Sequence, residues 1–151
     1  MSDGVLGIDY AKGRKNSKSL IYRLWRRTHE VSRAISTYLP SRHSISVLDL
    51  GCAEGSMLNT LSGLFEGEFT GIELSPELFS LACSEFPSLV FLNQDINNLD
   101  FLDSNNYDVI ICTAVLEHLE DPRRLLSSIN RLLRPGGITI WTVPDPLLEE
   151  I

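Results

Sequence analysis

The first third of the chain follows a helical pattern of apolar and polar residues. Over residues 17–40 apolar side chains recur every three or four positions while most arginines fall on other faces, which predicts an amphipathic helix ended by Pro40. We expect Trp25 to anchor this helix in the core. Residues 1–16 contain three glycines and several polar side chains, and we expect a flexible leader there.

From residue 45 onward short apolar runs alternate with helical stretches. The apolar runs predict five strands, at residues 46–50, 68–73, 89–92, 107–113 and 138–143. Helices are predicted between them, at residues 54–64, 75–85 and 121–134. This alternation predicts an α/β fold, a Rossmann-like doubly wound parallel sheet in the order 3-2-1-4-5. We expect one domain over residues 17–151, with a cofactor-binding core at residues 45–144.

Charge is distributed unevenly along the 151 residues. The net charge is −7, yet residues 1–42 carry nine Lys and Arg against three acids. Residues 43–122 carry fourteen acids and no Lys or Arg. Such an acidic body disfavours nucleic acid as a partner and favours a cationic ligand. No apolar run approaches the roughly 20 residues of a membrane span, and no signal core opens the chain, so we expect a cytoplasmic location.

The three cysteines stand singly and form no CxxC motif. Cys52, Cys83 and Cys112 lie in apolar surroundings, which predicts reduced core thiols and no metal site built on them.

The segment VLDLGCAEG, residues 47–55, predicts a small-molecule site. It reads as a buried strand, a tight turn of small residues and the start of a helix, and such turns lie at the carboxyl edge of a parallel sheet. The small residues Gly51, Ala53 and Gly55 give a G-x-A-x-G spacing, whereas a dinucleotide fold requires G-x-G-x-x-G. A carboxylate at Asp49 would repel phosphate and suits an ammonium or hydroxyl group.

Acids also follow the next two strands. Glu73 lies twenty-two residues after Gly51, where a carboxylate can accept two hydrogen bonds from a ribose diol. Asp95 and Ile96 offer a carboxylate for an exocyclic amine next to an apolar side chain for the face of a base. Taken singly, each acid has an alternative interpretation as an ordinary acidic residue at a strand end or in a solvated loop.

Five ordered motifs together identify a family. They are VLDLGCAEG, FTGIELS, NQDI, YDVIICTAVLEHLEDP and LLRPGGITIWTVPD. Over residues 45–144 the chain resembles the class I S-adenosylmethionine-dependent methyltransferases, in the type 11 or 12-like branch that modifies small metabolites. The resemblance implies S-adenosyl-L-methionine as cofactor, S-adenosyl-L-homocysteine as product and a small-molecule acceptor.

The resemblance also implies which residues line the cofactor. The implied contacts are Asp49, Gly51, Cys52, Ala53 and Gly55 for the methionine portion and the turn, Glu73 for the ribose, Leu74, Asp95 and Ile96 for the adenine, and Thr113 and Ala114 beneath the sulfonium. The family often has glycine where Ala53 stands, and a methyl group there should be tolerated.

His118 is the candidate catalytic residue, as a general base or a group that orients the acceptor; the alternative is a structural histidine. Ubiquinone-type O-methyltransferases bind a metal through Glu-x-x-Glu-His, but Ala114 stands at the first position here, so we expect no metal. The carboxylate of the cofactor needs a cation, and the leader helix should supply Arg26 or Arg27, with Lys12 or Arg14 as the next candidates.

Family members usually continue past the fifth strand with an antiparallel pair, so the chain is expected to be short of the full sheet. An exposed fifth-strand edge would favour a homodimer. Two other functions stay open, a non-catalytic S-adenosylmethionine-binding domain or fragment and an NAD-type oxidoreductase. Nucleic-acid methylation is disfavoured, because TAVL stands where an Asn-Pro-Pro-Tyr-like tetrapeptide would be expected.

Overall fold

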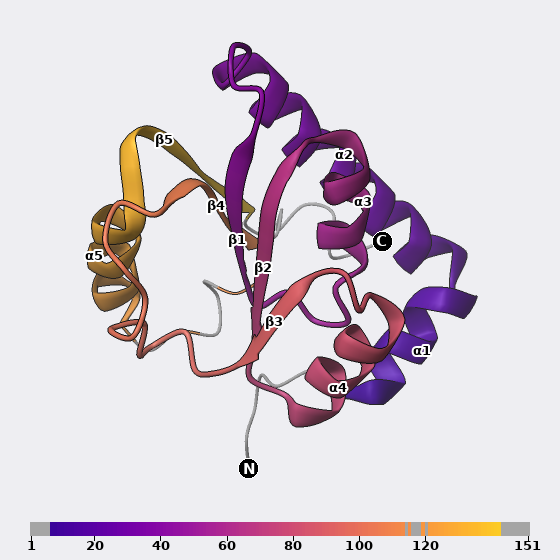
Figure 1. Cartoon of the computed structure of the whole chain (residues 1–151). Coiled ribbons are helices and arrows are strands. Elements are labelled where there is room, and N and C mark those ends of the chain that lie inside the picture. Colours follow the sequence, from indigo (N-terminus) through magenta and orange to yellow (C-terminus); the bar gives the residue numbers. More distant parts are fainter. Residues whose placement is uncertain (1–6, 114, 116–118, 120, 143–151) are drawn as a thin grey trace.

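The computed structural model describes residues 7–113, 115, 119 and 121–142. Its centre is a five-stranded sheet in which every neighbouring pair is parallel and the order is β3-β2-β1-β4-β5, which confirms the predicted fold (Figure 1). The strands are β1 (Ile45–Leu50), β2 (Gly67–Glu73), β3 (Val90–Asn93), β4 (Tyr107–Thr113) and β5 (Leu133–Thr142). The helices are α1 (Ile8–Asn16), α2 (Lys18–Tyr38), α3 (Ser56–Leu64), α4 (Pro76–Glu85) and α5 (Pro122–Leu132).

Helices cover both faces of the sheet. On one face α2, α3 and α4 contribute to a single apolar cluster with β1 and β4, whereas α5 packs on the opposite face (Figure 1). Within β1, Val47 belongs to the first cluster and Leu48 to the second, and both side chains are fully buried. Burial on both faces explains why β1 and β4 are largely continuous apolar runs rather than alternating ones.

Residues 8–16, where we expected a flexible leader, form helix α1. Ala11 is buried in a cluster with Ala53 and Leu78, and Lys15 forms an ion pair with Glu85 of α4. A nine-residue helix is marginal in isolation. Its stability therefore depends on this docking, which no local sequence pattern reports.

Two side chains expected in the core lie on the surface. Trp25 is 59% exposed, because α2 turns Val31 and Ile35 toward the sheet and Trp25 outward. Cys83 is exposed because its neighbour Ala82 takes the buried face of α4, whereas Cys52 and Cys112 are buried as predicted. None of the three cysteines forms a disulfide bond.

Strand β5 begins earlier than predicted. The RPGG segment was expected to end the preceding helix, but Leu133 already pairs with Tyr107, and the register shifts before Ile138 pairs with Val109. Gly137 permits this irregularity, because a Cβ there would lie 2.9 Å from the Arg134 carbonyl oxygen.

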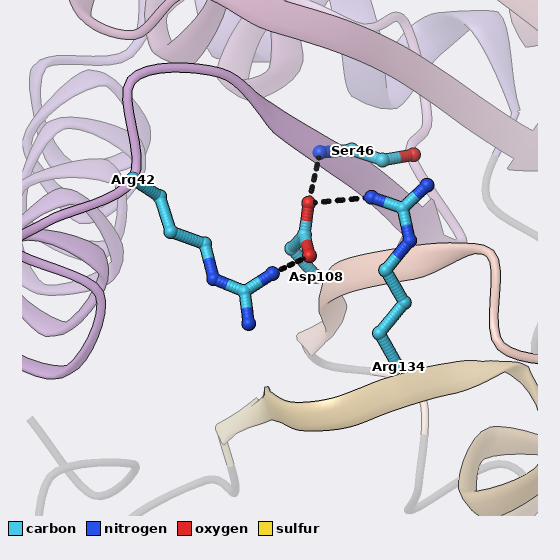
Figure 2. A network of polar contacts seen from close by, with 4 residues as sticks. All are labelled: Arg42, Ser46, Asp108 and Arg134. Carbon is cyan, nitrogen blue, oxygen red and sulfur yellow. Dashed lines mark hydrogen bonds and ion pairs between the residues drawn. The ribbon is translucent and has the colours of Figure 1, made fainter.

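Asp108 stabilises the edge of the sheet at which the strands begin, opposite the carboxyl edge. Its carboxylate is only 1% exposed and accepts hydrogen bonds from the Ser46 backbone N–H at 2.8 Å and from Arg134 Nη1 at 2.9 Å (Figure 2). Arg42 Nη1 donates to the second carboxylate oxygen. Two guanidinium groups thus neutralise one buried acid and connect the segment before β1 with the first residues of β4 and β5, which is a structural role.

Candidate functional site

The turn after β1 adopts an unusual backbone at alternate residues. Gly51, Ala53 and Gly55 have φ values of 78°, 51° and 80°, all in the left-handed region. The N–H groups of Gly51 and Cys52 both donate to the carbonyl of Ile72 in β2, at 2.8 and 3.0 Å. The predicted G-x-A-x-G turn is therefore present, and it is bound to the neighbouring strand.

Both glycines of the turn are also required by packing. A Cβ at Gly51 would lie 2.6 Å from Val115 Cγ2, and one at Gly55 would lie 2.7 Å from Phe91 Cζ. Side chains at these positions would collide with their neighbours as well as strain the backbone. The glycine spacing is thus explained by the turn itself, and the case for a ligand rests on the polar groups around it.

Glu73, at the end of β2, is the most constrained of those groups. Its side chain is 8% exposed, and Oε2 accepts from the Ala53 backbone N–H at 2.9 Å while Oε1 accepts from the Ser75 N–H at 2.8 Å. The bond to Ala53 helps to hold that non-glycine residue in its left-handed conformation. A carboxylate has about four lone-pair positions, so each oxygen can accept one further hydrogen bond. Among the described residues, no Lys or Arg pairs with Glu73.

This arrangement fits a ribose diol. The backbone donors fix the carboxylate plane, and the two oxygens can each receive one hydroxyl group. Asn93 of β3 donates through Nδ2 to the carbonyls of Glu73 and Leu74, at 2.8 and 3.0 Å, which fixes the end of β2. The Leu74 side chain is exposed beside it.

Buried negative charge concentrates around the turn. Asp49, Glu54 and Glu73 are all buried acids. Desolvation, and after it the carboxylates of Asp49 and Glu73, raise the pKa of the Cys52 thiol far above its ordinary value. The thiol therefore stays protonated, and the carboxylates that add to this shift favour a cationic ligand. Glu54 was not among the predicted site residues, although it is the one acid inside the turn.

The third and fourth strands bring their predicted residues to the same edge. Asp95 is exposed, and its Oδ1 accepts from the backbone N–H and the side-chain amide of Asn97, at 2.8 and 2.9 Å. Ile96 is half-buried against the cluster beneath α5, and Thr113 is buried at the end of β4. Ala114 and His118 lie outside the described residues.

The cations proposed for the cofactor carboxylate lie on two helices. Arg26 is exposed and Arg27 half-buried on α2. Lys12 and Arg14 belong to α1, the helix that packs through Ala11 against the turn. This contact places α1 next to the turn.

Neither a metal centre nor a membrane span is found in the part of the chain that the structure describes. No three His, Cys, Asp or Glu side chains there could hold a metal ion, and no described helix has the length and apolar character to cross a bilayer.

Comparison with known proteins agrees with this geometry. A family model described as a methyltransferase domain matches residues 48–141. The trans-aconitate 2-methyltransferase of Deinococcus radiodurans is 31% identical over 115 residues, which are 75% of this chain and 43% of that protein. The ubiquinone biosynthesis O-methyltransferase of Xanthomonas oryzae pv. oryzae is 30% identical over 95 residues, 60% of this chain and 39% of that protein.

A solved S-adenosylmethionine-dependent methyltransferase from Mesorhizobium loti superposes with a TM-score of 0.64 at 23% identity, covering 72% of this chain and 51% of that one, and supports the fold. The chain spans about two fifths of the length of the two curated relatives. The family match decides against the dinucleotide hypothesis, in agreement with the glycine spacing. The chain belongs to the methyltransferase domain family, whose members use S-adenosylmethionine as cofactor.

Proposed function

We propose that this domain binds S-adenosyl-L-methionine at the carboxyl edge of its sheet and transfers the methyl group to a small-molecule acceptor. The observation that carries the proposal is the Glu73 carboxylate, buried, oriented by two backbone N–H groups and left with acceptor capacity on both oxygens. When bound, the cofactor supplies a methyl group activated by a sulfonium. S-Adenosyl-L-homocysteine remains after transfer.

The other predicted residues surround this anchor in the proposed complex. Glu73 accepts the ribose hydroxyls, while Asp49 and the turn 51–55 face the methionine portion. The adenine lies among Leu74, Asp95 and Ile96, and the sulfonium lies above Thr113 and Ala114. Lys12 or Arg14 pairs with the carboxylate of the cofactor. His118 orients or deprotonates the acceptor.

Little acid–base chemistry is required of the protein, because the methyl group is already activated. The chain contributes by positioning the acceptor in line and by excluding water from the pocket. It must also avoid placing a competing nucleophile near the methyl group. The raised pKa of Cys52 serves this purpose, since a protonated thiol is a poor nucleophile.

The name of one relative points to an oxygen acceptor. One acts on trans-aconitate and another is an O-methyltransferase of ubiquinone biosynthesis, so small acids and phenols are the first acceptors to test. The absence of Lys and Arg from residues 43–122 supports a partner other than nucleic acid. A cytoplasmic location is part of the same proposal.

Calorimetric titration with S-adenosylmethionine, S-adenosylhomocysteine and NAD tests the function directly. We expect binding of the first two and none of NAD, followed by transfer of a labelled methyl group to a carboxylate or phenol acceptor. Binding without transfer to any acceptor would favour a non-catalytic binding domain. Binding of NAD alone would refute the proposal.

A homodimer through β5 is the proposed assembly. In the described sheet β5 pairs with β4 alone, so its other edge can accept a strand from a second copy. Light scattering at high protein concentration should give twice the mass of the chain, and a monodisperse monomer would contradict this assembly.

A further inference from the structure

The outer face of α2 exposes a group of large apolar side chains. Tyr22 is 56% exposed and Trp25 59%, Ile21 is also exposed, and Leu64 at the end of α3 is 60% exposed. Residues of α2 and α3 line a shallow groove of about 300 Å³ between these side chains. We call Ile21, Tyr22, Trp25, His29 and Leu64 the α2 surface. Exposed apolar clusters of this kind mark interaction sites more often than isolated residues do.

The aromatic rings of this surface are stacked on one another. The ring centroids of Tyr22 and Trp25 are 5.9 Å apart with planes at 28°, and those of Trp25 and His29 are 5.5 Å apart with planes at 11°. The neighbouring rings engage the indole, so a nucleic-acid base cannot stack freely on it. The stacked rings of Tyr22, Trp25 and His29 present their edges to the surroundings. Those edges carry polar groups that favour an interface between water and an apolar phase.

Cations continue the same rows of side chains along α2. Residues four apart lie on one line of a helix, and Lys18, Tyr22 and Arg26 form such a line. A neighbouring line runs from Ile21 through Trp25 and His29 to Arg33. Helix α2 carries five Lys and Arg against one acid, Glu30, and that acid lies 3.5 Å from Arg33.

The α2 surface lies on the half of the helix nearer the candidate site. The C-terminus of α2 leads through residues 39–44 to the start of β1, at the amino edge of the sheet. Tyr22 and Trp25 stand thirteen to sixteen residues before that end, or about 20–24 Å along the axis, which is about the length of β1. The exposed rings therefore reach the level of the carboxyl edge.

We propose that the α2 surface docks the domain on an anionic lipid membrane. Tyrosine and tryptophan edges suit the headgroup level of a bilayer, and flanking Lys and Arg are attracted to anionic lipids. A partner helix would need a continuous apolar groove, but the α2 part of this one extends only from Ile21 to Ser32, about 16 Å. Docking in this way brings the carboxyl edge close to a membrane-borne acceptor.

Vesicle partitioning tests this proposal without any cofactor, so its failure is distinguishable from failure of the proposed methyl transfer. The chain has two tryptophans, and Trp141→Phe leaves Trp25 as the only one. Vesicles of phosphatidylglycerol and phosphatidylcholine in equal parts should shift Trp25 emission to the blue and co-sediment with the protein at 0.15 M salt. Vesicles of phosphatidylcholine alone should bind at least ten-fold more weakly.

Two pairs of variants separate charge from apolar contact. Each cation near an anionic surface should raise the partition coefficient about five-fold, so Lys18→Ala with Arg26→Ala should lower it about 30-fold. The matched control is Arg123→Ala with Arg124→Ala, two exposed cations of α5 on the opposite face of the sheet, which should change it less than two-fold. Trp25→Ser should abolish co-sedimentation, whereas Leu126→Ser on α5 should not.

Equal binding to neutral and anionic vesicles would overturn the proposal, as would no binding at millimolar lipid or an equal effect of the α5 control. Binding to polyuridylate or polyglutamate that depends on Lys18 and Arg26, without vesicle binding, would assign the surface to a different class of partner and would also overturn it. Unchanged far-ultraviolet circular dichroism and unchanged urea unfolding midpoints of the α2 variants would show that they are folded.

Discussion

Replacing Glu73 by glutamine removes one charge from the centre of the candidate site with little change of shape. Both carboxylate oxygens accept backbone N–H groups, so the new amide NH₂ must face either the Ala53 or the Ser75 donor. One buried N–H then loses its acceptor, which costs about 1–3 kcal/mol of stability. The free energy of unfolding should fall by this amount while the fold is retained.

The effect on cofactor affinity follows from the same contacts. A ribose hydroxyl that donates to an ionised acceptor gains about 1.5–3 kcal/mol, so losing the charge should raise the Kd for S-adenosylmethionine roughly 10- to 150-fold. S-Adenosylhomocysteine has the same ribose and should lose affinity by a similar factor. Calorimetric titration of both ligands, together with a urea unfolding curve of each protein, provides the measurement.

Glu77→Gln is the matched control. Glu77 is an exposed acid in the first turn of α4, four residues from Glu73, and its replacement should change the Kd less than two-fold. A Glu73→Gln protein that keeps its fold and binds S-adenosylmethionine within two-fold of the unmodified protein would refute the assignment of Glu73 to the ribose.

Three further predictions concern stability. Gly55→Ala should lower the free energy of unfolding, measured in urea, by about 2–4 kcal/mol, because φ is 80° at this position and Phe91 Cζ would lie 2.7 Å from the new Cβ. The control Gly63→Ala, in an open position of α3, should be neutral or stabilising. Asp108→Asn should lower the free energy of unfolding by about 2 kcal/mol in the same measurement, because it removes the charge that pairs with two partly exposed arginines. It should leave S-adenosylmethionine affinity unchanged, since Asp108 lies at the opposite edge of the sheet from the candidate site, and weakened binding would contradict this expectation. Folding raises the pKa of the Cys52 thiol above its ordinary value of 9.0, so as pH rises the thiol ionises first in the unfolded protein. The free energy of unfolding should therefore fall as pH rises above about 9. Cys52→Ala should reduce the slope of this fall by up to about 1.4 kcal/mol per pH unit.

The centre of the sheet could be predicted from sequence because β1 and β4 are buried on both faces. The run from Tyr107 to Thr113 has an apolar character that only a central strand tolerates, and its predicted bounds agree with the structure. The site turn could be predicted for a related reason. The backbone at Gly51 and Gly55 is left-handed, a conformation that glycine adopts most readily, so the two glycines in the sequence indicated the turn.

What the sequence could not reveal depends on contacts between distant segments. Helix α1 is stabilised where Ala11 meets Ala53 and Leu78, and nothing within residues 8–16 encodes that contact. Trp25 fits an apolar helical stripe by spacing alone, but the sheet accepts only a narrower stripe around Val31 and Ile35. Side-chain type and period therefore predicted a buried ring where the structure places an exposed one.

The two edges of the sheet show how a structural acid differs from a binding acid. Asp108 and Glu73 are both buried carboxylates beside apolar strands, and composition does not separate them. Asp108 is neutralised by two guanidinium groups, so its charge is already satisfied within the protein. Glu73 is held by neutral N–H groups among the described residues, which orient the carboxylate but leave its full charge. Burying an ion in this way costs several kcal/mol, and a ligand that supplies hydroxyl groups and a positive charge offsets that cost. This difference is why we propose that S-adenosylmethionine binds at the carboxyl edge of the sheet.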